Sequence, residues 1–243
     1  QKADWQFNHR QLCDFVRTAD SRAAEAASAA EAACKSDVVR GATCYICLGE
    51  GPGLVRGCAC RGDAGYAHVR CLVRAEAELD RESRDGLGQC PTCRQFYHGV
   101  VRRAVAWGEW RAVARCPGER FFRALRELGM ALNECGQHED ALVLIRCHLK
   151  IQKSWWRGLK GRELLECQVG FAGEQTNLAN ILGSLGKEDE ACGIHRESFG
   201  LLKRAKGVEA PDTITVGLNL ASSLKVTGHF QEARKLLEEM LPV

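Results

Sequence analysis

Half of the chain's fourteen cysteines lie in one stretch whose spacing suits metal binding. The order from Cys44 to Cys93 is C-x2-C-x10-C-x-C-x7-H-x2-C-x18-C-x2-C, with His68 as its one histidine. Eight nitrogen and sulfur ligands are enough for two closed tetrahedral zinc sites, which are structural because they leave no open position. The predicted ligands of two Zn2+ ions are Cys44, Cys47, Cys58, Cys60, His68, Cys71, Cys90 and Cys93.

The remaining seven cysteines are scattered singly along the chain. A disulfide scaffold is short, secreted and dense in cysteine throughout, and this sequence shows neither that density nor a secretory leader. We therefore expect reduced thiols in a cytoplasmic, reducing compartment. The scattered cysteines are interpreted as small buried hydrophobic side chains.

Composition excludes several classes of partner. The formal net charge is +3, from 34 Lys+Arg against 31 Asp+Glu, which is too small to predict binding to nucleic acid or to an anionic membrane. The longest apolar run, Ala141 to Ile145, is five residues, whereas a membrane-spanning helix needs about 18. The sequence therefore predicts no membrane segment.

The sequence predicts a mostly α-helical protein with four regions. Residues 1–40 are rich in alanine and are expected to form a helix or tail. Residues 41–99 contain the predicted metal ligands. Residues 100–118 are expected to form a basic helical linker. Residues 119–243 are expected to form about three helical hairpins, stacked as an α-solenoid that continues past the last residue.

An internal repeat supports the solenoid. Three segments share the frame L-[AG]-x-x-L-x-x-x-G-x-x-x-[ED]-A, with turn glycines Gly136, Gly186 and Gly228. Each segment reads as a helix, a glycine turn and a second helix. One hairpin cannot bury its apolar face alone, so several must stack. The first two glycines are 50 residues apart and the last two 42, with the extra residues around Trp155.

The repeats resemble tetratricopeptide repeats of the kinesin-light-chain type, in which PD-x6-NLA opens a repeat. Pro211-Asp212 and Asn219-Leu220-Ala221 match that pattern. The resemblance implies that the repeats bind a peptide or protein substrate in a concave groove, with Asn177 and Asn219 as groove residues. The alternative is that the repeats only hold the fold together.

The cysteine cluster resembles the RING-CH (RING-variant) domain, a cross-brace that holds two zinc ions. The matching residues are Ile46, Gly62, Tyr66, the H-x-x-C-L segment from His68 to Leu72, and the closing Cys90-Pro91-Thr92-Cys93. A PHD finger is disfavoured because its gap between the fourth cysteine and the histidine is shorter than the seven residues here. That family also places an aromatic residue where this chain has Gly88.

The RING-CH resemblance implies how the ligands pair. In that family one zinc is held by the first and third ligand pairs, here Cys44, Cys47, His68 and Cys71. The other zinc is held by the second and fourth pairs, here Cys58, Cys60, Cys90 and Cys93.

The same resemblance implies a RING-type E3 ubiquitin ligase, which positions a ubiquitin-charged E2 enzyme and forms no covalent intermediate. The implied contacts to the E2 and ubiquitin are Ile46, Leu72, Pro91 and Arg94. Ala75 stands where the family usually has a tryptophan in the E2 groove, which favours the alternative of a non-enzymatic zinc-finger and repeat adaptor. A ligase that relays ubiquitin through its own cysteine is disfavoured, because none of the scattered cysteines lies in an obvious motif with a histidine.

Overall fold

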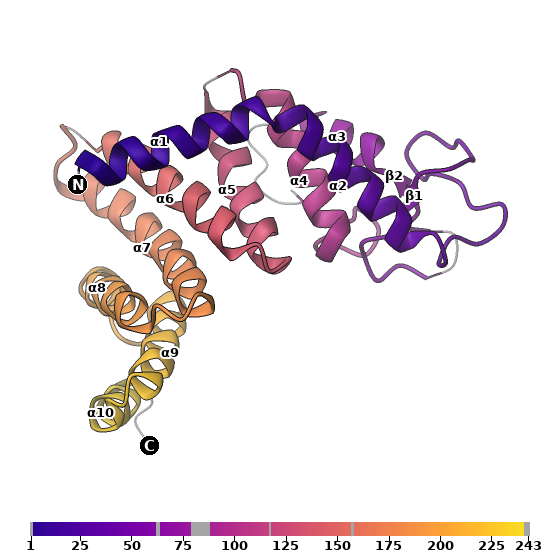
Figure 1. Ribbon diagram of the computed structural model, residues 1–243. Helices are drawn as coiled ribbons and strands as arrows, with labels where there is room; N and C mark the ends of the chain where they lie inside the picture. Colours follow the sequence, from indigo (N-terminus) through magenta and orange to yellow (C-terminus); the bar gives the residue numbers. More distant parts are fainter. Residues whose placement is uncertain (1, 62–63, 79–87, 117, 157, 241–243) are drawn as a thin grey trace. The chain divides into compact units, whose positions relative to one another are not determined.

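The computed structural model describes residues 2–61, 64–78, 88–116, 118–156 and 158–240, which are mostly helical with one small sheet (Figure 1). The chain divides into two compact units, Gln1–Gln137 and His138–Val243. The helices of the first unit are α1 (Lys2–Arg17), α2 (Ala19–Cys34), α3 (Val69–Glu78), α4 (Gly99–Val113) and α5 (Glu119–Glu134). The helices of the second unit are α6 (His138–Ser154), α7 (Gly161–Ser184), α8 (Glu188–Lys206), α9 (Pro211–Val226) and α10 (Phe230–Met240). Among the described helices, none combines the length and the apolar character needed to cross a bilayer.

The alanine-rich stretch forms α2, which packs against α4 and β1. Its buried positions recur every three or four residues along one face of the helix, and each is at most 5% exposed: Ala19, Ala23, Ala26 and Ala30. Small side chains on this face let the two helix backbones approach closely. The sequence predicted the helix, and the structure adds that it is a packed part of the first unit.

Helix α4 lies at the centre of the first unit, whereas its basic sequence favoured a solvated linker. Trp107 and Trp110 are only 3% and 0% exposed. The Trp110 indole N–H donates to the carbonyl oxygen of Phe15 at 3.0 Å, and the Phe15 ring stacks on Trp107 with centroids 5.8 Å apart. Gly108 lets α3 pack on α4, because a Cβ added there would collide with Val73. The arginines of α4 occupy only its remaining, partly exposed face.

A two-stranded antiparallel sheet joins the segments of the first unit that carry the predicted metal ligands. Strand β1 is Leu54–Val55 and strand β2 is Ala67–His68, with Leu54 opposite His68 and Val55 opposite Ala67. All four residues are buried. The pairing therefore places the chain just before Cys58 beside the strand that carries His68.

The turn glycines predicted from the repeat end their helices as expected. Gly136, Gly186 and Gly228 have φ values of 76°, 71° and 82°, a left-handed conformation that costs glycine little. In each turn the amide of the next residue donates to a leucine carbonyl oxygen five residues back, at 2.9, 2.9 and 2.7 Å: Gln137 to Leu132, Lys187 to Leu182 and His229 to Leu224. These are Schellman-type helix ends.

The second unit has a continuous apolar core between its hairpins. Helix α7 packs on α6 and α8, and α9 packs on α8 and α10. The core includes Phe199, Leu202, Leu220, Leu224, Leu236 and Met240. The first predicted repeat differs from the other two, because its helices α5 and α6 belong to different compact units.

Candidate metal centre

The eight predicted ligands gather into two clusters, each of which could hold a metal ion. In each cluster the candidate ligand atoms all lie within 4.8 Å of one another. The first cluster is Cys44, Cys47, His68 and Cys71, and the second is Cys58, Cys60, Cys90 and Cys93. These are the two groups that the resemblance implied, and they are interleaved along the chain.

Two nearly identical turns supply half of the ligands. In the first, the Cys44 amide donates to Gly49 O at 2.9 Å and the Leu48 amide donates to Cys44 O at 2.8 Å. In the second, the Cys90 amide donates to Gln95 O and the Arg94 amide to Cys90 O, both at 2.8 Å. We call these turns the first and second knuckles.

The two knuckles also share an unusual backbone conformation. Leu48 and Arg94, each directly after the second cysteine of its knuckle, have φ values of 58° and 59°. They are the two residues other than glycine with positive φ among the described residues. Non-glycine residues adopt this conformation only where their surroundings hold them there, and such strain is concentrated at functional sites.

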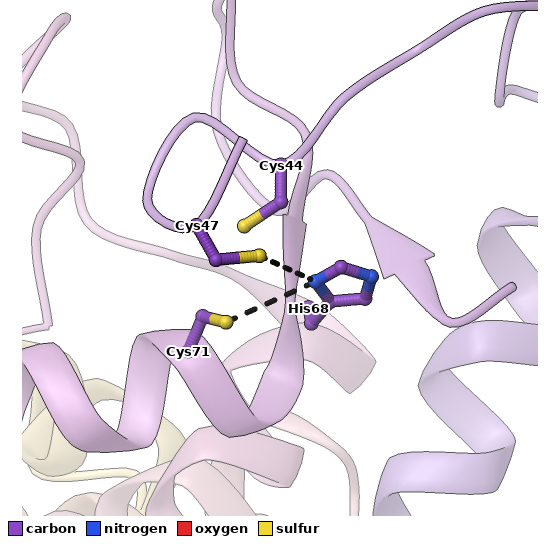
Figure 2. Close-up of side chains that lie close together, drawn as sticks. All are labelled: Cys44, Cys47, His68 and Cys71. Carbon is purple, nitrogen blue, oxygen red and sulfur yellow. Dashed lines mark hydrogen bonds between the residues drawn. The ribbon is translucent and has the colours of Figure 1, made fainter. Parts of the chain in front are cut away.

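In the first cluster, His68 faces the thiols through one ring nitrogen (Figure 2). Its Nδ1 lies 3.5 Å from Cys47 Sγ and 3.8 Å from Cys71 Sγ. Strand β2 ends at His68, and Cys71 follows in the first turn of α3, so one strand-to-helix junction supplies both ligands. His68 is buried, and Cys71 is partly buried.

In the second cluster, Cys60 Sγ lies 3.6 Å from Cys90 Sγ. The segment that carries Cys58 and Cys60 follows β1 and passes close to Gly65, which has a φ of 147°. A Cβ added at Gly65 would lie 2.7 Å from the Cys60 Cβ, so this glycine makes room for a ligand. Gly62, which also matches the RING-CH pattern, lies outside the described residues.

The thiols within each cluster differ in acidity. Burial raises the pKa of Cys44, but hydrogen bonds from the backbone of Cys47, His68 and Ile46 outweigh burial and lower it to about 6. Burial and the neighbouring thiols raise the pKa of Cys71 to about 11. One thiolate therefore suppresses ionisation of the next, and a bound cation is what would allow all of the ligands to be deprotonated together.

The second cluster has the same asymmetry. The backbone of Gln95 lowers the pKa of Cys93 to about 7, with burial opposing it. Burial raises the pKa of Cys60 far above its ordinary value, and the thiols of Cys90 and Cys93 add to the effect. Both donor sets are thus arranged around a position suited to positive charge.

A pair of tyrosines links the two knuckles. The hydroxyl oxygens of Tyr45 and Tyr97 are 2.9 Å apart, although the residues are 52 positions apart in the sequence. The Tyr45 amide donates to Tyr66 O at 2.9 Å, which also ties the first knuckle to the segment before β2. Sequence reasoning missed this pair; the position of each tyrosine near a knuckle was the signal that could have found it.

The predicted E2 contacts divide into exposed and buried residues. Ile46, Pro91 and Arg94 are exposed on the knuckles. Leu72 is only 3% exposed, so its prediction as a surface contact needs correction. Its position on the inner face of α3 makes it a core residue, which the H-x-x-C-L motif alone does not reveal.

Two further apolar side chains are exposed beside the metal clusters. Leu48 in the first knuckle is 77% exposed, and Phe96, two residues after Arg94, is 57% exposed. Sequence reasoning missed both, because only the fold shows that the segments carrying them are at the surface. Ala75, where the family usually has tryptophan, is partly buried on α3.

The two predicted groove asparagines lie in the second unit. Asn177 is on α7 and Asn219 on α9, and both are partly exposed. The Asn177 side-chain amide donates to Glu174 at 3.3 Å. Their role in binding a partner stays a prediction.

Comparison with known proteins gives only distant structural likenesses. No family model matches the chain, and no curated protein matches it. Two crystal structures from Podosopora anserina, both described as kinesin light chain with nearly identical TPR-like repeats, are similar to it. One has 18% identity and a TM-score of 0.45, covering 71% of this chain and 82% of that one. The other has 14% identity and a TM-score of 0.45, covering 99% and 94%.

A third similar structure is BtubC (BKLC) from P. vanneervenii, with 16% identity and a TM-score of 0.34. It covers 58% of this chain and 69% of that one. At these identities and TM-scores, structural similarity does not by itself support a fold assignment. The assignment as stacked helical hairpins rests on the helices of this chain.

Proposed function

We propose that the two clusters hold zinc ions in a RING-variant cross-brace. Zinc binds sulfur at about 2.3 Å and nitrogen at about 2.0–2.1 Å, so a tetrahedral site places two sulfurs about 3.8 Å apart and a sulfur and a nitrogen about 3.6 Å apart. The observed separations are 3.5 and 3.8 Å from His68 Nδ1 to sulfur and 3.6 Å between two sulfurs. The donor spacing therefore fits zinc. A cytoplasmic, reducing location follows from the same proposal, because the ligands must remain thiolates.

We further propose that this unit is a RING-type ubiquitin ligase that binds a ubiquitin-charged E2. The observation that carries the proposal is the pair of matching knuckles, which present Ile46 and Leu48 on one and Pro91 and Arg94 on the other. Apolar residues with an arginine beside them are the composition expected of a protein-binding surface. Zinc would supply the rigidity of this surface and take no part in bond making.

Arg94 is the residue we assign to contact both the E2 and ubiquitin. Its amide is bonded to Cys90 O, and its left-handed backbone is fixed by the second knuckle. A guanidinium offers five N–H donors in a planar fork, so it can donate to two proteins at once. Holding the thioester in few conformations favours attack by a substrate lysine, and this is catalysis by positioning.

The repeats are proposed to be tetratricopeptide-like and to recruit the substrate protein. Stacked hairpins of this kind form extended surfaces suited to peptide binding. We retain Asn177 and Asn219 as the residues to test, because both are partly exposed on α7 and α9. Alanine at both positions should leave helicity unchanged and reduce recovery of partners in a pulldown.

The second candidate function is a non-enzymatic adaptor, favoured by two residues. Ala75 removes a large aromatic contact from the E2 groove, and Leu72 is buried. Both reduce the apolar area that could bind an E2. In this case the knuckles would bind a protein partner without supporting ubiquitin transfer.

Discharge of ubiquitin from a panel of E2 thioesters distinguishes the two functions. The wild-type chain should accelerate discharge from at least one E2. Arg94→Ala should slow it roughly tenfold, the loss expected when a charge-assisted hydrogen bond of about 1.4 kcal/mol is removed. Arg162→Ala is the matched control, because its side chain is 90% exposed on α7. Absence of accelerated discharge with every E2 would rule out the ligase and favour the adaptor.

A further inference from the structure

The extra residues between the first two turn glycines lengthen a helix of the second unit. Helix α7 has 24 residues, whereas α9, its counterpart in the next hairpin, has 16. This difference equals the difference between the glycine spacings of 50 and 42 residues. The insertion therefore extends the start of α7, and Trp156 lies in the segment that leads into it.

Trp156 is held in place by backbone and ring contacts. Its amide donates to Lys153 O at 3.3 Å, and its carbonyl oxygen accepts from the Leu159 amide at 3.0 Å. Its ring meets the Phe171 ring edge-on, with centroids 4.8 Å apart, and Phe171 is only 5% exposed. The adjacent Trp155 is 56% exposed. Of the two neighbouring tryptophans, Trp156 is therefore the one packed against the fold.

The rings of Trp156 and Phe171 line a cavity of about 410 Å³, formed by the end of α6 together with α7 and α8. Lys153 of α6 and Arg204 of α8 also line it. Lys153 Nζ lies 5.2 Å from the centre of the Phe171 ring. Arg204 Nη1 lies over Gly200, where an added Cβ would be 3.4 Å from it. A cavity of this volume is large enough for a small ligand or one large side chain.

The charges that line the cavity favour an anion. Lys153 and Arg204 are exposed, and within the described part of the chain neither forms an ion pair with a carboxylate. A third cation, Arg196, is already bonded to Glu232 of α10 at 2.9 and 3.0 Å. Glu197 is the one carboxylate among the described residues that line the cavity. The two cations without a carboxylate partner therefore outweigh it.

The cavity lies on the side of α7 away from the predicted groove residue. Gln168, Phe171 and Gln175 line it at i, i+3 and i+7, which is one side of a helix. Asn177 comes two residues after Gln175, which is roughly 200° further round the helix. A ligand in this cavity is therefore separate from one bound at Asn177.

The next hairpin has no equivalent of the aromatic wall. Counted back from the turn glycines, Thr213 of α9 stands where α7 has Phe171, and Gly217 stands where it has Gln175. The residues that lead into α9, Val208-Glu209-Ala210, include no aromatic side chain. The cavity is thus a product of the insertion, and the repeat frame alone does not create it.

We propose that this cavity binds a phosphotyrosine side chain of a partner protein. One such side chain supplies both a planar ring, which packs against Trp156, and an anion, which Lys153 and Arg204 contact. Its charge of about −1.5 to −2 at pH 7 matches two cations, and a guanidinium can donate to two phosphate oxygens at once. Aspartate, glutamate and phosphoserine offer the anion without the ring. The proposal does not depend on ubiquitin transfer by the first unit.

NMR titration of the full chain under reducing conditions tests the proposal. The probe is a capped pentapeptide with one phosphotyrosine at the centre of four glycines. The indole N–H signal of Trp156 should shift to saturation, whereas that of Trp155 should not. Matched peptides with tyrosine or phosphoserine at the centre, and inorganic phosphate, should bind at least roughly tenfold more weakly, because each lacks the ring or the anion.

Variants test the individual contacts. Trp156→Ala and Arg204→Gln should each weaken binding of the phosphotyrosine peptide roughly tenfold. Arg204 is exposed, so its variant should keep the fold. Trp155→Ala and Lys187→Gln are the matched controls outside the cavity and should leave binding unchanged. Glu197→Gln should tighten binding, because it removes the carboxylate that repels the phosphate.

Three results would overturn the proposal. One is the absence of a saturable shift with the phosphotyrosine peptide. Another is equal binding of the phosphoserine peptide or of inorganic phosphate, which would show a general anion site. The third is binding that Trp156→Ala and Arg204→Gln leave unchanged but Asn177→Ala abolishes, because the peptide would then lie in the predicted groove.

Discussion

The region that carries the two cysteine clusters and the repeats of the second unit are held together by different kinds of contact. Between Cys44 and Cys93 the described structure has two strands of two residues each and one helix of ten. Its ties join distant segments, such as Tyr45 and Tyr97, 52 residues apart. The second unit instead stacks neighbouring hairpins over a continuous apolar core. On the zinc proposal, the first region is held together by metal ligation, whereas the second is held together by repeated local packing.

Removing metal should produce the largest difference in stability between the two regions. A structural zinc contributes about 10–16 kcal/mol of folding free energy in zinc-finger peptides, and this region has little apolar core to replace it. Chelation under reducing conditions should abolish hydrogen-exchange protection of β1 and β2 while leaving α7 to α10 protected. Retained protection of the strand amides after metal loss would show that packing alone holds the region together.

Adding a methyl group at a closely packed glycine should lower the stability of the repeats. Gly217→Ala places a Cβ against Met240 and 3.0 Å from the Phe199 ring in the second unit. Such overpacking costs about 1–3 kcal/mol, which should exceed the gain of up to about 1 kcal/mol from alanine's helix preference. Gly193→Ala is the matched control on α8, where an added Cβ meets nothing within 4 Å; it should be neutral or stabilising by up to about 1 kcal/mol. Thermal unfolding should show a lower midpoint for Gly217→Ala only. Equal midpoints for the two variants would contradict the close packing of α9 around Gly217.

The two units should also respond to pH in opposite directions. In the first unit, burial raises the pKa of Glu109 from 4.5 to about 7, with Arg123 opposing the rise. The folded state then binds a proton that the unfolded state has lost, so stability falls between pH 4.5 and 7. Glu109→Gln should remove this loss and stabilise the first unit by about 1 kcal/mol at pH 8, since the side chain is only partly buried. Denaturant unfolding at pH 5 and pH 8 measures the difference; an equal effect at both would contradict it.

In the second unit the sensitive group is His195. Burial lowers its pKa below 6.5, so the unfolded state binds a proton more readily. Stability is therefore full above pH 6.5 and falls as the pH is lowered below it. Hydrogen exchange in α8 and α9 should report this loss in the wild type and in an exposed-histidine control, His229→Gln. The loss should be absent in His195→Gln; persistence there would assign it to another group.

The sequence predicted which eight residues form the two clusters that could hold metal ions, because ligand types and spacing can be recognised without tertiary information. Grouping them into interleaved sets required the family resemblance, since no spacing rule alone selects partners across the fold. The turn glycines were predictable for a similar reason: a helix end at Gly186 or Gly228 depends on residues close in sequence.

Tertiary packing accounts for what the sequence did not predict. Helix α4 reads as basic, yet Trp107 and Trp110 are in the core, because burial depends on which face α2 and α3 cover. Leu72 was misplaced for the same reason. The position of the unit boundary, within the first repeat, depends on contacts that a repeat frame does not encode.

We propose that the first unit is built around two interleaved clusters, each of which holds one metal ion. Substituting cadmium-113 for the native metal and correlating each cadmium signal with protein side chains tests this claim directly. One signal should correlate with Cys44, Cys47, His68 and Cys71, and the other with Cys58, Cys60, Cys90 and Cys93. A signal that joins Cys47 to Cys60, or a chain that binds a single ion at saturation, would contradict the account.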